Sequence, residues 1–198
     1  MSNSWYKFES LFAAACFFES SLALLALILA WLAGINPMIS LEWTWQALTY
    51  GVLGTLPLLA MFFSLHQVSA PAIQQIRQLL LATLGPMLSP YSWQHLLLLG
   101  AIAGFAEELL FRGVLEPWLA SNLGYTAGLL LSNLLFGLVH AVTPLYALLA
   151  GLVGLYFSVS TTFGGGYNLL TPILIHGLYD FLAFIALVRM YRTWENPL

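Results

Sequence analysis

Six ionisable side chains interrupt apolar stretches of this chain: Glu107, Glu108 and Arg112 in one stretch, His140 in a second, and His176 and Asp180 in a third. An ionisable residue inside a bilayer costs at least about 2.5–3.5 kcal/mol on insertion scales, so it is a functional candidate by default. Carboxylates and imidazoles are the groups that transfer protons near neutral pH. The pattern therefore indicates acid–base chemistry within a membrane.

The spacing of the first group separates its two acids. Glu108 and Arg112 are four residues apart and share a helix face, so they can form an ion pair. Glu107 lies about 100° around the helix and points elsewhere. A poorly solvated carboxyl without a cation beside it can serve as a general base near neutrality. The alternative is a buried salt-bridge network that only fixes helix packing, but two adjacent acids are more than one Arg can neutralise.

Each histidine is weaker evidence for a catalytic site than the acid cluster when it is taken alone. His140 ends an uncharged run, where an isolated His is more often a packing residue than a catalyst. His176 and Asp180 are four residues apart, so the acid can hold the imidazole in one tautomer, or the two can form a purely local structural pair.

Composition identifies the class of protein. Of the 198 residues, 61 % are hydrophobic and only 7 % are charged, whereas a soluble domain carries roughly a quarter charged residues. A soluble enzyme and a disordered chain are both excluded. The net charge of −3 gives no basic surface for nucleic acid. The single cysteine, Cys16, excludes an intrachain disulfide and a Cys-based zinc cage.

The elements that must position these groups are membrane-spanning helices. Six apolar runs have about the length that a span needs: residues 11–33, 46–65, 95–115, 123–143, 144–163 and 169–190. The segment 71–84 has one apolar face and fits a helix along the bilayer surface, which Gly85-Pro86 and Ser89-Pro90 then break. The sequence thus predicts an all-α, polytopic membrane bundle of about six spans plus one interfacial amphipathic helix.

Orientation follows from the few cations. Six spans would place Lys7, Arg77, Arg189 and Arg192 on one side, which the positive-inside tendency makes cytoplasmic. Both termini are then expected in the cytoplasm, and the small size and short loops favour a bacterial inner membrane. Glu19, in the first run, either faces the bundle interior or lies near an interface.

The expected spans also bring the ionisable groups to similar depths. At about 1.5 Å per residue, Glu107, His140, His176 and Asp180 fall in the middle of the bilayer, within a band of about 10 Å. Known routes to intramembrane hydrolysis can then be compared with the residues present. An aspartyl dyad needs two Asp and the chain has one; His-Glu-x-x-His and Gly-x-Ser-x-Gly are absent. A Glu/His site that activates water remains, with or without a metal.

The three groups together resemble the signature of the CPBP family, the CAAX-prenyl-protease and bacteriocin-processing intramembrane proteases. The resemblance spans about residues 101–184 and rests on Glu107-Glu108-x-x-x-Arg112, Phe136-x-x-x-His140 and His176-x-x-x-Asp180. It implies a catalytic four-span core over residues 93–190, preceded by a two-span region with the interfacial helix (1–92) and followed by a short tail (191–198).

The resemblance also implies a role for each residue. Glu107 would activate water with His140 beside it, while Glu108 and Arg112 would support the site. His176 and the residue four later would stabilise the oxyanion. Family members often carry Asn at that last position, so Asp180 is either protonated here or orients and charges His176.

Cofactor and substrate follow from the same resemblance. A metal-free site is favoured; the alternative is zinc held by Glu107, His140, His176 and Asp180, whose donor types suit it. The expected activity is endopeptidase cleavage of a membrane-bound or lipidated peptide or protein. The alternative is a non-catalytic membrane protein such as an immunity factor, scaffold or small transporter, because intramembrane acids also mark ion pathways.

Overall fold

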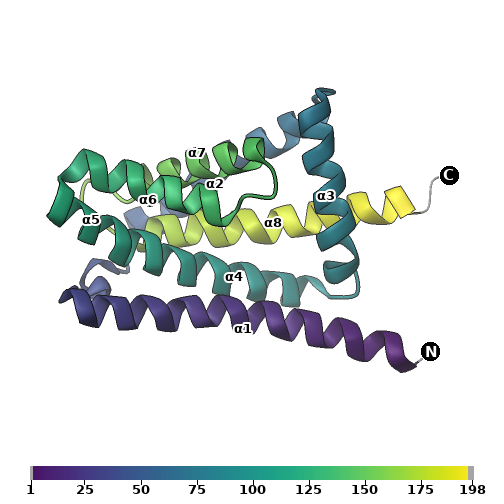
Figure 1. The fold of residues 1–198 in the computed structure, drawn as a ribbon, viewed down its shortest axis with the longest axis horizontal. Helices are drawn as coiled ribbons and strands as arrows, with labels where there is room; N and C mark the ends of the chain where they lie inside the picture. Colours follow the sequence, from purple (N-terminus) through teal and green to yellow (C-terminus); the bar gives the residue numbers. More distant parts are fainter. Residues whose placement is uncertain (1, 196–198) are drawn as a thin grey trace.

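Long helices aligned along one axis form the body of the protein. The computed structural model describes the backbone of residues 2–195 and the side chains of residues 11–194. Helices α1 (Ser2–Ala33), α4 (Trp93–Leu110) and α8 (Leu170–Glu195) run side by side, and α2 (Trp45–Gln67) lies behind α8 (Figure 1). No β-strand occurs within residues 2–195, so the predicted all-α fold is confirmed.

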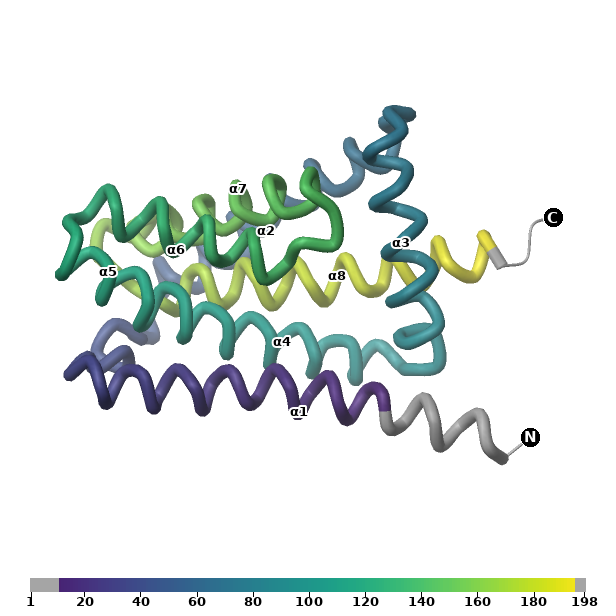
Figure 2. The backbone as a smooth tube through the Cα atoms, in the orientation of Figure 1, coloured from purple at the N-terminus to yellow at the C-terminus, as the bar shows by residue number. Residues whose placement is uncertain are grey.

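Shorter helices complete the bundle. The segment η2 (Phe111–Leu115) and α5 (Glu116–Leu123) continue directly from α4, and the chain then returns through α6 (Tyr125–Val139) and α7 (Pro144–Ser160). Gly124, with φ of +89°, makes the sharp turn between α5 and α6. A short 3-10 helix, η1 (Pro37–Ser40), connects α1 to α2 at the end of the molecule far from both termini (Figure 2).

Helix α3 (Pro71–Leu88) crosses the end of the bundle where both termini lie (Figure 1). The sequence predicted this surface helix, but the predicted break at Gly85-Pro86 is wrong, because α3 continues through Pro86 and ends before Ser89. Gly85 lies in contact distance of α8: a Cβ there would be 2.3 Å from the ring of Tyr191. Gly85 therefore allows α3 to pack closely against α8, and it does not end the helix.

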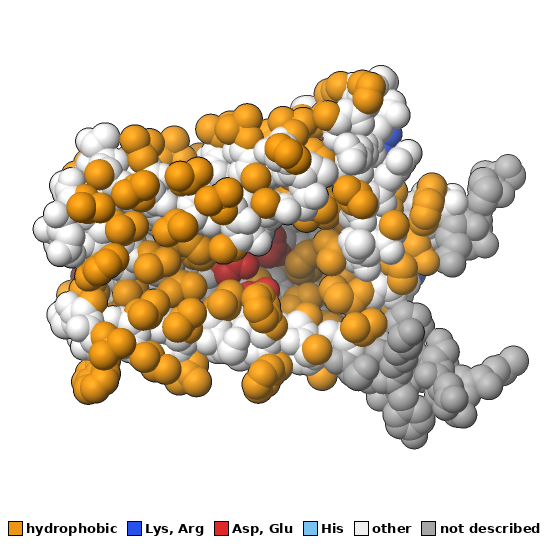
Figure 3. Space-filling model, in the orientation of Figure 1, with side chains coloured by type: hydrophobic (Ala, Val, Ile, Leu, Met, Phe, Trp, Pro, Cys, Tyr) orange, Lys and Arg blue, Asp and Glu red, His pale blue; other side chains and the backbone are white. Residues whose placement is uncertain are grey.

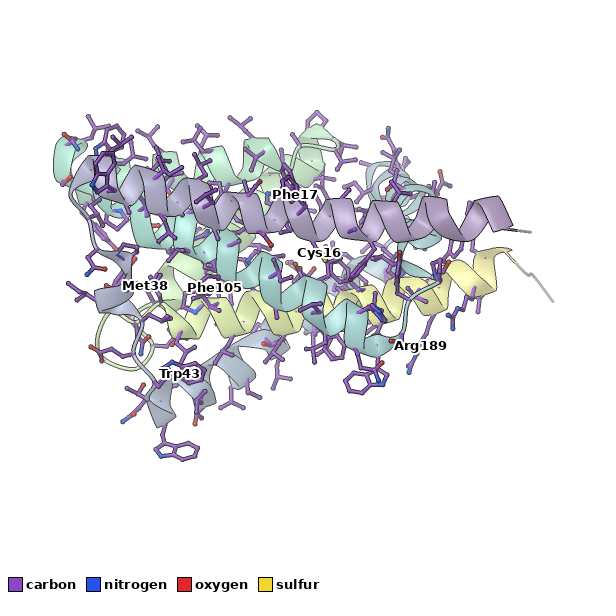
Figure 4. All side chains as sticks on the ribbon, turned by 90° about the horizontal axis from the view of Figure 1, so that it is seen from below. Cys16, Phe17, Met38, Trp43, Phe105 and Arg189 are labelled. Carbon is purple, nitrogen blue, oxygen red and sulfur yellow. The ribbon has the colours of Figure 1, made fainter. Side chains whose placement is uncertain are left out.

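The predicted cations gather at this same end. Arg77 of α3 donates to the carbonyl of His66 at 2.7 Å, and Arg192 of α8 donates to that of Ser89 at 2.9 Å. Arg189 lies nearby (Figure 4), and the side chain of Lys7 lies outside the described residues. Which side of the membrane this end faces stays a prediction.

Among the residues that the structure describes, three helical segments are long and apolar enough to cross a membrane: Leu11–Ala33, Trp45–Gln67 and Leu170–Trp194. The apolar helices α6 and α7 are shorter, with 15 and 17 residues, and α4 has 18 residues that include two acids. The structure is thus that of a helical membrane bundle, and the count of six spans stays a prediction.

Glycine allows α4 and α8 to approach closely beside the predicted site. A Cβ at Gly104 would lie 2.6 Å from the backbone nitrogen of Gly177, and one at Gly100 would lie 2.8 Å from its carbonyl oxygen. Small residues at helix interfaces provide most of the packing in membranes, where apolar side chains gain little from leaving lipid. This contact fixes the position of His176 relative to Glu108.

Candidate active site

Glu107 and His140 form the first half of the site. Glu107 is 7 % exposed on α4, and its Oε2 lies 3.4 Å from Nε2 of His140 at the end of α6. The Nδ1 atom of His140 is 2.8 Å from the carbonyl oxygen of Phe136. A carbonyl can only accept, so Nδ1 carries a proton and donates. The other nitrogen is left to face the carboxylate of Glu107.

Glu108, His176 and Asp180 form the second half. Oε1 of Glu108 lies 2.9 Å from Nδ1 of His176, and Oδ2 of Asp180 lies 3.5 Å from its Nε2. Carboxylates thus face both ring nitrogens of an imidazole that is only 5 % exposed. Both contacts suit an imidazolium that carries a proton on each nitrogen.

Arg112 holds Glu108 from the other side. Its Nη1 donates to Oε1 of Glu108 at 3.0 Å, and its Nη2 donates to Oδ1 of Asn133 at 2.8 Å and to the carbonyl of Gly154 at 2.6 Å. Arg112 and Glu108 are both fully buried. A Cβ at Gly154 would lie 2.9 Å from Nη2, so glycine provides the room for the guanidinium.

Three polar residues that the sequence analysis did not select complete this network. Ser158 donates to Glu116 at 2.5 Å and accepts from the Asn133 amide at 2.9 Å, and it lies 3.4 Å from Nε of Arg112. The sequence does contain a signal for these three residues. Glu116 lies four residues after Arg112, hence one turn on, and Asn133 and Ser158 are polar residues within apolar helices.

The segment η2 shapes the helix between Arg112 and Glu116. Here the chain makes a π-helical turn in which the backbone N–H of Glu116 bonds to the carbonyl of Phe111, five residues earlier. Such turns are rare and often occur at functional sites. The hydroxyl of Tyr167, from the loop before α8, donates to the carbonyl of Arg112 at 2.7 Å and satisfies a backbone group in this turn.

Two phenylalanine rings position the imidazoles. Phe136 stacks on His140 with centroids 4.5 Å apart, and Phe157 stacks on His176 at 4.6 Å. The guanidinium of Arg112 lies 4.5 Å from the centroid of the Phe136 ring, within cation–π range. The aromatic groups therefore restrict the rotation of both imidazoles and partly shield the buried cation.

A cavity of about 210 Å³ opens beside these groups. Its walls come from α2, α3, α6, α7 and α8 and are mostly apolar, and its polar groups include His140, Tyr146, His176, Tyr179 and Asp180. On the face shown in Figure 3, Asp and Glu side chains lie at the bottom of a hollow in an otherwise hydrophobic surface. A mostly apolar pocket with a few convergent polar groups is typical of a binding site.

All six predicted site residues lie in this one region, as two contacting groups on either side of α4. Of the two other histidines, His66 lies at the end of α2 and lines the same cavity, whereas His95 is exposed near the start of α4. Cys16 of α1 lies beside α4 (Figure 4) and packs in an apolar cluster. Glu19 faces the bundle interior, one of the two positions that the sequence left open.

The arrangement is not that of a metal cage. Within the described residues, no three His, Cys, Asp or Glu side chains are gathered so that they could hold a metal ion. Both nitrogens of His176 face carboxylates, and Nδ1 of His140 donates to a backbone carbonyl. The four residues considered as zinc ligands therefore do not fit a zinc site in this conformation.

Comparison with known proteins identifies the part of the chain that carries the site. No curated protein and no solved structure matched the chain. Residues 89–182 match the family model described as "Type II CAAX prenyl endopeptidase Rce1-like". The matched segment includes Glu107, His140 and His176 with their contacts, and it excludes α1, α2 and α3. Residues 89–182 therefore match an Rce1-like type II CAAX prenyl endopeptidase domain, which is consistent with a CPBP family intramembrane protease.

Proposed function

We propose that this protein hydrolyses a peptide bond of a membrane-associated substrate with a water molecule activated by Glu107 and His140. The family match supports a membrane endopeptidase in general. The observation that carries the specific proposal is the pair of contacts on either side of α4, Glu107 with His140 and Glu108 with His176, beside one cavity.

The geometry of the first pair suits water activation. Oε2 of Glu107 and Nε2 of His140 are 3.4 Å apart, and with Nδ1 protonated a neutral His140 presents a lone pair at Nε2. Both atoms can therefore accept a hydrogen from one water molecule. Glu107 then takes a proton as the water oxygen attacks the substrate carbonyl, and that proton passes to the leaving amine.

His176 has the complementary role. A tetrahedral intermediate places negative charge on the former carbonyl oxygen, and a cationic imidazole at the edge of the cavity stabilises that charge. Glu108 and Asp180 stabilise the cation and fix its ring plane. Asp180 thus orients and charges His176, instead of donating to the oxyanion directly.

We further propose that the site works without a metal and that the apolar cavity receives an apolar segment of the substrate. The support is the internal pairing of the imidazole nitrogens and the largely apolar wall. No specific observation favours the scaffold or transporter alternative, since the ionisable groups converge instead of lying at three separate sites.

The test compares peptides released from membranes that contain the wild-type protein, a Glu107→Gln variant or a Glu42→Gln variant. Glu42 is an exposed acid in the loop before α2, so its replacement is a matched control. Removing a general base is expected to lower the rate at least 10²-fold. Peptides should therefore be released by the wild type and the control but not by Glu107→Gln. Equal release by all three proteins would contradict the assignment.

A further inference from the structure

The oxyanion of the proposed hydrolysis needs hydrogen-bond donors, and the two histidines of the site have no N–H group left for it. Nδ1 of His140 donates to the carbonyl of Phe136 at 2.8 Å, and its Nε2 faces Glu107. Carboxylates lie 2.9 Å and 3.5 Å from the two ring nitrogens of His176. His176 therefore brings positive charge to the cavity, but each of its N–H groups already points to an acid.

Two tyrosine hydroxyls in the wall of the same cavity have no role in the mechanism above. They belong to Tyr146 of α7 and Tyr179 of α8, and within residues 11–194, whose side chains the structure describes, neither hydroxyl hydrogen-bonds to another protein group. A tyrosine hydroxyl away from water usually finds a partner. Tyr156 donates to a backbone carbonyl of α2 at 2.8 Å, and Tyr167 donates to one of η2 at 2.7 Å. The two cavity hydroxyls are therefore available to a bound molecule.

The connection between α6 and α7 places Tyr146 beside His140. Tyr146 lies in the first turn of α7, six residues after His140, and its backbone N–H donates to Oγ1 of the N-cap residue Thr143 at 3.1 Å. A Cβ at Gly137 of α6 would lie 2.5 Å from the carbonyl oxygen of Ala147, so the two helices touch through their backbones here. Gly137 is one turn before His140, and Ala147 follows Tyr146. This contact therefore fixes the two side chains relative to each other.

Of the two hydroxyls, that of Tyr146 lies on the side of the activated water, because the water is held between Glu107 and His140. The electrostatic interactions of Tyr146 agree with this placement, since they join it to Asp180 and to Glu107. The ring of Tyr179 lies edge-on to Phe62 of α2, with centroids 6.5 Å apart. Tyr179 therefore belongs to the α2 side of the cavity.

We propose that Tyr146 is a catalytic residue whose hydroxyl donates a hydrogen bond to the oxyanion, while His176 supplies the positive charge. The inference rests on the proposed hydrolysis. When the water oxygen bonds to the carbonyl carbon, the π electron pair moves to the carbonyl oxygen, and Glu107 takes the proton of the water. Tyr146 keeps its own proton throughout. When the C–N bond breaks, the electron pair returns to form the carbonyl, and the proton on Glu107 passes to the leaving amine.

The first test measures kcat and KM of Tyr146→Phe on peptides whose release depends on Glu107. Loss of an oxyanion donor is expected to lower kcat by about 10²-fold and to leave KM within about twofold of the wild type. The free energy of unfolding should not fall, because the hydroxyl has no partner in the protein. Tyr125→Phe is the matched control: Tyr125 begins α6 and is 72 % exposed, so all three quantities should stay unchanged. A kcat for Tyr146→Phe within about twofold of the wild type would overturn the proposal.

The second test needs no hydrolysis. It uses the Glu107→Gln protein in micelles and two probes: a tetraleucine peptide, and the same peptide with a phosphinate in place of its central amide. The phosphinate is tetrahedral and anionic, as the oxyanion is, so it should bind more tightly than the amide. Adding Tyr146→Phe should weaken binding of the phosphinate by about 10- to 100-fold and leave that of the amide unchanged.

The outcomes of this second test separate the two proposals. Equal affinity for the two probes, or a phosphinate affinity that Tyr146→Phe leaves unchanged, would overturn the role of Tyr146 even if hydrolysis is confirmed. Weaker phosphinate binding by the Tyr146→Phe variant of a protein that releases no peptide would support the hydroxyl as the anion donor and contradict the proposed hydrolysis.

Discussion

The close contact of α4 and α8 makes Gly104→Ala a quantitative test of how the fold positions the site. A Cβ at Gly104 would lie 2.6 Å from the backbone nitrogen of Gly177, and ordinary contact begins at about 3.4 Å. The partner atoms are backbone, so no side chain can rotate away and the helices must separate by about 0.8 Å. Overpacking of this kind destabilises by about 1–3 kcal/mol.

The same displacement acts directly on the site, because Gly177 follows His176 and Gly104 is one turn before Glu108. The contact between His176 Nδ1 and Glu108 Oε1 would lengthen from 2.9 Å to about 3.7 Å, beyond hydrogen-bond distance. Misplacement of a catalytic group by about 1 Å can cost about 10²-fold in rate. Gly104→Ala should therefore lower peptide release by about that factor.

The assay measures two quantities, the rate of peptide release and the free energy of unfolding, the second by equilibrium unfolding in mixed micelles. Gly166→Ala is the matched control, because a Cβ there meets nothing within 4 Å and the residue lies in an exposed loop. It should leave both quantities unchanged. If Gly104→Ala kept the wild-type rate and stability, the helix contact would not be what positions His176, and the reasoning from this interface would be refuted.

Three further predictions concern the polar network and the metal. Arg112→Leu removes the guanidinium that pairs with the fully buried Glu108, and unfolding measurements should show a loss of about 3–5 kcal/mol. An unchanged stability would mean that this ion pair does not stabilise the fold. Ser158→Ala removes the hydrogen bonds that this hydroxyl makes with Glu116 and with the Asn133 amide, and it should destabilise by about 1–3 kcal/mol. The exposed Ser121→Ala should change stability by less than about 0.5 kcal/mol. Peptide release should persist after dialysis against a zinc chelator; loss of release that added zinc restores would contradict a metal-free site.

The sequence predicted the local part of the site well because that part depends on helical periodicity. The ion pair of Glu108 with Arg112 and the contact of His176 with Asp180 both follow from a four-residue spacing on a helix. The similar depth of Glu107, His140 and His176 in the bilayer was also predictable, because the number of residues from the end of an apolar helix gives the depth directly. The catalytic roles of these residues stay predictions, because geometry alone does not measure a rate.

Contacts between helices could not be predicted in the same way. Glu108 and His176 are 68 residues apart, and their 2.9 Å contact depends on the glycine interface of α4 and α8. The π-helical turn at Phe111–Leu115 has no periodic signal of its own. Gly85 was misread for the same reason: its role is contact with Tyr191, and the ring that needs the space is more than one hundred residues away.

Adjacent acids on one helix explain how a bilayer protein can hold a structural charge and a reactive one side by side. The offset of about 100° between consecutive residues directs Glu108 into a fully buried contact with Arg112 and His176, and Glu107 toward His140. Glu108 is matched by fixed cationic partners, so its charge is stable and its geometry rigid. Glu107 has no such cation: its Oε2 faces the neutral imidazole of His140 at 3.4 Å. Both acids keep a buried Oε2 without a hydrogen bond, so it is the fixed cations that distinguish them. The carboxyl without a fixed cation is the one that can exchange a proton with water, and its paired neighbour fixes the helix that carries both.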